Sequence, residues 1–133
     1  MKTAVIYWSG TGNTEAMANA VAEGAGVSAV TVSDFSGSAA DYDAFAFGCP
    51  AMGAEVLEED EFEPFFTGIE GELSGKKVAL FGSYGWGDGE WMRNWQDRVK
   101  AAGAELVAEG LIANEAPDDD ALESCKKLGA LLA

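Results

Sequence analysis

TAVIYWSGTGNT, residues 3–14, is the stretch that decides how this chain folds. Its first half, Thr3–Trp8, is a continuous apolar run of the kind found in parallel strands that are buried on both faces. Its second half, Ser9–Thr14, is a turn of small polar residues. One helical face follows it, formed by Met17, Ala20, Val21 and Gly24. Their spacing of i, i+3, i+4 and i+7 predicts a helix, so the stretch opens as strand, loop and helix.

The same alternation continues along the rest of the chain. Further strand-like runs lie at 27–32, 44–48, 78–82 and 106–112, the last interrupted by Gly110. Helical stripes lie at 62–73, with Gly75 as stop signal, at 91–102, ended by Gly103, and in a last helix that Pro117 opens. The segment 34–43 has room only for a short helix. Five strands interleaved with helices predict an α/β fold, a single parallel sheet with helices on both faces, in one domain over residues 1–133.

The charge and composition narrow the function. Asp and Glu number 23 against 8 Lys and Arg, a net charge of −15, which disfavours nucleic acid and anionic membranes and favours partners with basic faces. The chain has no His, so Ser-His-Asp and Cys-His chemistry is excluded. Two cysteines without a CxxC pair predict no metal site. No signal peptide or membrane-length apolar run is visible, which predicts a cytoplasmic protein with reduced thiols.

Three loops are candidates for ligand binding, because ligands of open α/β sheets bind at the carboxyl ends of the strands. The first loop, Ser9–Thr14, offers hydroxyls, an amide and backbone N–H groups beside a helix N-terminus, which together favour a bound phosphate. It matches neither a Walker A loop nor G-x-G-x-x-G, and none of the basic residues lies within it. A phosphate there would be held by neutral donors, although a bare structural turn is the alternative.

The second and third loops, Pro50–Glu55 and Ser83–Asp88, carry side chains suited to a planar ligand. Met52 follows a strand and lies outside any helical periodicity, so its thioether could lie on a ring, or it could simply close a crevice. Gly53 indicates a backbone that takes, or switches between, uncommon dihedral angles. Trp86 lies between glycines, which favours stacking on a planar ligand over a place in the core.

Three nearby residues are assigned to the core instead. Cys49 has no basic neighbour to lower its pKa, so it is interpreted as core and not as a reactive thiol. Trp91 and Trp95 share one helical face, four residues apart, and packing is the better interpretation for both.

Four stretches give the chain a close resemblance to the short-chain bacterial flavodoxins: VIYWSGTGNTEAMA (5–18), GCPAMGAEVLE (48–58), FEPFF (62–66) and GKKVALFGSYGWGDGEWM (75–92). The resemblance implies the strand order 2-1-3-4-5, for which flavodoxin is itself the standard example. It also implies non-covalent FMN and a low-potential one-electron carrier that shuttles electrons between redox proteins, without substrate chemistry of its own.

The resemblance also implies roles for individual residues. The phosphate of FMN would be held by the first loop, Met52 would cover one face of the ring and Trp86 the other. Gly53 would present its carbonyl to N5, and Glu55 would accept from N3–H. The complete implied set is Ser9, Gly10, Thr11, Gly12, Asn13, Thr14, Pro50, Ala51, Met52, Gly53, Ala54, Glu55, Ser83, Tyr84, Gly85, Trp86, Gly87 and, near the dimethylbenzene edge, Asn114. Ala54 and Pro50 stand where some relatives have polar residues.

Two other functions of the same fold compete with this interpretation. An FMN-dependent enzyme such as a quinone reductase would need room for a substrate over the ring, which Met52 and Trp86 would deny. A receiver module would need acidic residues after the first strand, where this chain has Ser9 and Gly10. The expected partners of a carrier are reductases and low-potential oxidoreductases with basic docking faces. The carrier itself is expected to be a monomer.

Overall fold

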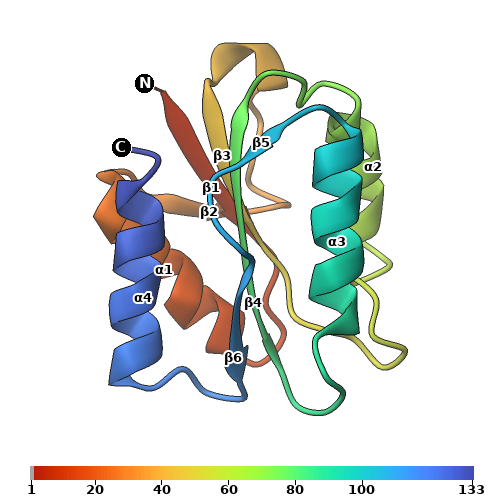
Figure 1. The fold of residues 1–133 in the computed structure, drawn as a ribbon, viewed down its shortest axis with the longest axis vertical. Coiled ribbons are helices and arrows are strands. Elements are labelled where there is room, and N and C mark those ends of the chain that lie inside the picture. Colours follow the sequence, from red (N-terminus) through yellow and green to blue (C-terminus); the bar gives the residue numbers. More distant parts are fainter. Residues whose placement is uncertain (1) are drawn as a thin grey trace.

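The computed structural model describes residues 2–133, which form a parallel sheet between two pairs of helices (Figure 1). The strands are β1 (Thr3–Tyr7), β2 (Ala29–Thr31), β3 (Ala44–Gly48), β4 (Lys77–Tyr84), β5 (Glu105–Leu106) and β6 (Leu111–Asn114). The helices are α1 (Asn13–Ala25), α2 (Phe62–Glu70), α3 (Glu90–Ala101) and α4 (Asp119–Ala130). A short 3₁₀ turn over Ala39–Asp41 is the only helical piece described between β2 and β3, as the short segment 34–43 predicted.

The sheet confirms the predicted order, β2-β1-β3-β4-β5, with every pairing parallel. The fifth strand is split, and β6 rejoins the sheet by pairing with β4. Gly110 lies at the split, where its N–H bonds the side chain of Gln96 and a Cβ would overlap the side chain of Met92. The backbone leaves the ladder here because it packs directly on α3, so the sheet counts six strands and not the five predicted.

Each face of the sheet has its own core. Helices α1 and α4 cover one face, and α2 and α3 cover the other (Figure 1). Trp91 and Trp95 are 1% exposed and pack against α2 and the sheet, which confirms that they are core residues.

Helices α1 and α4 approach each other at two glycines. A Cβ on Gly24 would overlap the carbonyl of Lys126, and a Cβ on Gly129 would overlap the carbonyl of Val21. The backbones can lie this close only because both positions lack a side chain. Since α1 begins at the Ser9–Thr14 loop, this contact fixes the helix that carries the loop.

Several predicted boundaries are wrong, and three of them bear on the site or its supports. Helix α2 ends at Glu70 with Gly71, not at Gly75, because Leu73 reaches the core from the turn that follows the helix. Strand β4 continues through Ser83 and Tyr84, which were predicted as loop, because β6 pairs with them. Pro117 precedes the last helix, whose N-cap is Asp118, with its side chain accepting from Ala121 N–H at 2.8 Å. Across residues 2–133, the helices are too short or too polar for any of them to cross a bilayer.

Candidate functional site

The Ser9–Thr14 loop leaves backbone donors free at the start of α1. The Ser9 hydroxyl accepts from Gly12 N–H at 3.1 Å and from Glu15 N–H at 3.2 Å. Gly12, with φ 95°, is the N-cap and supplies no side chain, and no hydrogen bond within residues 2–133 uses the N–H groups of Gly10, Thr11, Asn13 and Thr14. Unpaired N–H groups at a helix N-terminus favour an anion.

The Thr14 side chain points into the protein. It is 1% exposed, its hydroxyl lies 3.1 Å from the Ser83 hydroxyl, and its oxygen accepts from Ser83 N–H at 3.3 Å. Thr14 therefore links the first loop to the end of β4, a role that the sequence did not predict.

A groove of about 530 Å³ lies where the three loops meet at the carboxyl ends of the strands. Such a volume is typical of a small-ligand site. Backbone bonds fix its walls: Trp8 N–H donates to the Gly48 carbonyl at 2.9 Å, and Ala51 N–H donates to the Ser83 carbonyl at 3.0 Å. Its lining is Trp8, Gly10, Thr11, Asn13, Pro50, Ala51, Met52, Ser83, Tyr84, Gly85, Glu115 and Ala116. The structure thus brings nine predicted residues, from all three loops, into one groove.

A second, more polar hollow of about 450 Å³ adjoins the groove at Trp8, Gly10 and Thr11. Ser9 and Gly12 line it, with Glu15 and Glu61 at its rim. The Tyr7 hydroxyl donates to Glu15 at 3.0 Å, and burial together with this carboxylate raises the pKa of Tyr7. The side of the Ser9–Thr14 loop away from the groove is therefore acidic.

The second loop contains a turn in which Glu55 N–H donates to the Met52 carbonyl at 2.7 Å. Gly53 does not have a positive φ, and a Cβ there would meet open space. The expectation of an uncommon dihedral angle at Gly53 is therefore not met in this conformation; the left-handed residue is Glu55, with φ 52°. Gly53 and Ala54 are exposed and do not line the groove.

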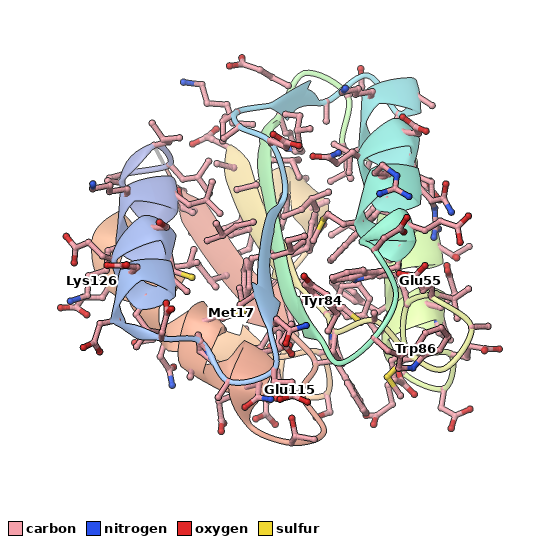
Figure 2. The ribbon with its side chains drawn as sticks, turned by 60° about the horizontal axis from the view of Figure 1, so that its bottom comes forward. Met17, Glu55, Tyr84, Trp86, Glu115 and Lys126 are labelled. Atoms are coloured by element: carbon pink, nitrogen blue, oxygen red, sulfur yellow. The ribbon has the colours of Figure 1, made fainter. Side chains whose placement is uncertain are left out.

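Trp86 is 62% exposed and is not among the residues that line the groove. Tyr84 lines it instead, with its ring tilted by 47° against the ring of the buried Trp91. Figure 2 looks toward this end of the molecule and shows Tyr84, Trp86, Glu55 and Glu115 gathered there. Gly87 lies beside Glu55, because a Cβ on Gly87 would overlap that carboxylate.

Glu58 links the start of α2 to Cys49, which directly precedes the second loop. Its carboxylate accepts from the N–H groups of Asp60, Glu61 and Phe62 at 2.7–2.8 Å, at the start of α2. Burial raises the pKa of Glu58, but these three bonds outweigh burial and leave the pKa below its usual value. Glu58 N–H in turn bonds the Cys49 sulfur at 3.3 Å, and burial raises the pKa of that thiol, as expected of a core cysteine.

The last strand adds residues that the sequence analysis missed. Asn114 ends β6 beside Tyr84 but does not line the groove; Glu115 and Ala116, which follow it, do. Glu115 has φ 56°, and its N–H donates to the Tyr84 carbonyl at 2.7 Å. Applying the carboxyl-end rule to β6 as well would have found both. Trp8 was predicted to belong to the first strand, but it follows β1 and lines the groove.

Comparison with known proteins identifies the family. The flavodoxin family model matches residues 5–129. The chain is 49% identical over 131 residues to a flavodoxin of Megasphaera elsdenii, covering 94% of this chain and 93% of that protein. It is 48% identical over 133 residues to a flavodoxin of Clostridium beijerinckii, covering 93% and 96%. The solution structure of the two-electron reduced Megasphaera elsdenii flavodoxin superposes with a TM-score of 0.85 at 46% identity, covering 98% of this chain and 97% of that one.

Proposed function

The chain belongs to the flavodoxin family and is an FMN-binding electron carrier, and from this premise we propose that the groove between its three loops is the FMN site. We further propose that residues 1–133 act as one domain and catalyse no substrate reaction of their own. The observation that carries the proposal is the row of unpaired N–H groups at the start of α1, next to a groove whose described lining holds no Lys or Arg.

The phosphate end of FMN fits the first loop. The N–H groups of Gly10, Thr11, Asn13 and Thr14 supply neutral donors, and the Thr11 and Ser9 hydroxyls lie beside them. No Lys or Arg is among the described residues that line the groove, so the helix N-terminus and these donors would hold the phosphate without an ion pair.

The ring end fits the second and third loops. Met52, Tyr84 and Trp8 give this part of the groove apolar walls, which would exclude water from a flat aromatic ligand. We propose that exposed Trp86, the Gly53 carbonyl and the Glu55 carboxylate complete the site, in the roles that the resemblance implies. FMN bound there takes up and releases single electrons; the protein supplies its environment.

The charges around the groove favour electron release. Glu115 is the only charged side chain in the lining described, and the chain as a whole carries −15. Fixed negative charge disfavours further negative charge in the groove, which makes a loaded protein a stronger reductant.

Ligand titration tests the site. FMN-free protein titrated with FMN should lose tryptophan fluorescence as a visible flavin absorption band shifts, and riboflavin, which lacks the phosphate, should bind far more weakly. Equal affinity for FMN and riboflavin would refute the proposed phosphate site. The FMN-loaded protein should also fail to turn over small quinones with a nicotinamide donor, since steady turnover would make it an enzyme.

We propose that the partners are redox proteins with basic docking faces, and that the carrier is a cytoplasmic monomer. Acidic residues follow several strand ends near the groove: Glu55, Glu58, Glu59, Asp60, Glu61, Asp88, Glu90, Glu115, Asp118, Asp119 and Asp120. Charges of one sign around a site steer a partner of opposite charge.

Salt dependence tests this docking proposal. The rate of reduction by a basic-faced reductase should fall about 10-fold or more as salt rises from 0.1 to 1 M, because the Debye length shortens from about 10 to about 3 Å. A flat rate across that range would leave the acidic residues a role in solubility alone.

A further inference from the structure

Glu55 has an uncommon backbone conformation, and its side chain contacts a segment far away in the sequence. Its φ of 52° lies in the left-handed region, where residues 2–133 place only one other non-glycine residue. The conformation is uncommon for a residue with a side chain and persists where surrounding contacts hold it. In Glu55 those contacts lie in a segment of the chain 34 and 35 residues away.

The contacts are hydrogen bonds to the start of α3. Oε1 of Glu55 accepts from Gly89 N–H at 3.2 Å and from Glu90 N–H at 3.3 Å. Gly89, the N-cap of α3, has no side chain with which to cap the helix. The carboxylate also lies against Gly87, where a Cβ would overlap it. Glu55 therefore supplies the cap of α3 from another loop.

The carboxylate joins segments that both reach the groove. On one side, the Glu55 backbone closes the turn to Met52, and Met52 N–H donates to the Val56 carbonyl at 2.9 Å. On the other side, Gly87 and Gly89 continue from Gly85. Met52 and Gly85 belong to different loops and both line the same groove. The hydrogen bonds of Glu55 therefore restrain both walls of the groove at the end proposed for the flavin ring.

We propose that Glu55 is a positioning residue that ties the second loop to the third before FMN arrives. One oxygen, Oε1, holds both N–H groups, and Oε2 has no hydrogen-bond partner within residues 2–133. The tie therefore leaves an acceptor of the same carboxylate available to a ligand. Its part in cofactor binding depends on the proposed FMN site, whereas the tie itself is a property of the FMN-free chain.

Amide hydrogen exchange of the FMN-free protein tests the tie. In Glu55→Ala, exchange at Gly89 and Glu90 should speed up about 10-fold or more, while the strands keep their protection. Glu55→Gln keeps an acceptor oxygen and should restore most of the protection. Glu59→Ala is the matched control and should change neither amide, because Glu59 is an exposed neighbour whose side chain makes no hydrogen bond within residues 2–133. Unchanged exchange in Glu55→Ala would overturn the proposal.

A second variant tests the tie without removing the carboxylate. Gly87→Ala places a methyl group where the carboxylate lies, and it also strains the backbone, because Gly87 has φ 88°. Only the backbone strain should remain in a Glu55→Ala background, so Gly87→Ala should add less to the exchange rate there than in the wild type. Gly85→Ala, where a Cβ meets nothing, controls for the added methyl group, and Gly75→Ala, at φ 78° with open space around a Cβ, controls for the strain of a side chain at a positive φ. Full additivity of Gly87→Ala and Glu55→Ala would show that the two do not act through one contact, and would overturn the proposal.

FMN titration of the same variants separates this inference from the proposed function. Glu55→Ala should weaken FMN binding about 10-fold or more, and Glu55→Gln should recover most of the loss. Recovery of affinity by Glu55→Gln together with recovery of amide protection supports a tie that preorganises the site. If the wild-type protein failed to bind FMN, the proposed function would fall, yet the exchange experiment would still decide the tie.

Discussion

Replacing Gly129 by Ala should destabilise the protein, although Ala is the better helix former. A Cβ at position 129 would overlap the carbonyl of Val21, so α1 and α4 would have to move apart. Overpacking of this kind typically costs about 1–3 kcal/mol. The gain from helix propensity is at most about 1 kcal/mol, and less near the C-terminal end of α4. We therefore expect a net loss of about 1–2 kcal/mol.

Urea unfolding of the FMN-free protein measures the change in the free energy of unfolding. At roughly 3–5 °C per kcal/mol, the same loss should lower Tm by about 3–10 °C. Gly68→Ala is the matched control: Gly68 also lies in a helix, but a Cβ there meets nothing and its φ is not positive. The control should raise stability by about 0.5–1 kcal/mol. Equal stability of Gly129→Ala and wild type, or the same loss in both variants, would refute the close contact of α1 with α4.

Three further predictions concern the site and its supports. Thr11→Ala should weaken FMN binding by about 0.5–1.5 kcal/mol in a fluorescence titration and leave riboflavin binding unchanged, since only the phosphate contact is removed. Arg98→Ala should lower the free energy of unfolding in urea by about 1–2 kcal/mol, because the half-buried guanidinium bonds Glu63 at 2.8 Å and Glu70 at 3.0 Å, and Arg98→Lys should recover only part of the loss. Glu58→Gln should be less stable than wild type at pH 7, and the difference in the free energy of unfolding should shrink as the pH falls below about 4.5. Folding lowers the pKa of the Glu58 carboxylate, so the carboxylate contributes stability that acid removes. A difference that does not change with pH would count against this role of Glu58.

The buried parts of the fold could be predicted from sequence because burial leaves a pattern. The run Ala44–Gly48 matches β3 residue for residue, and the break of the last strand at Gly110 is where the structure has it. The end of α2 could not be predicted, because Leu73 keeps the helical spacing while it reaches the core from a turn. Periodicity reports which residues are buried and not which backbone carries them.

The site could be located from sequence but not described in detail. The carboxyl-end rule brought the three loops to one groove, since it depends only on strand direction. It did not show that Thr14 turns inward to Ser83, nor that Glu55 and not Gly53 takes the left-handed conformation. Both depend on contacts between segments far apart in the sequence, for which a local motif carries no signal.

The outermost strands of the sheet have a consequence for how this protein behaves in a crowded solution. β2 has three residues and β5 has two, and the four residues of β6 pair only after a break. An open strand edge is a template on which another chain can add, and the hazard grows with the length of straight, unpaired backbone. Here neither edge offers more than a few consecutive groups, and the high negative charge repels a second copy. Short edge strands and like charge therefore both oppose aggregation of this electron carrier with other copies of itself.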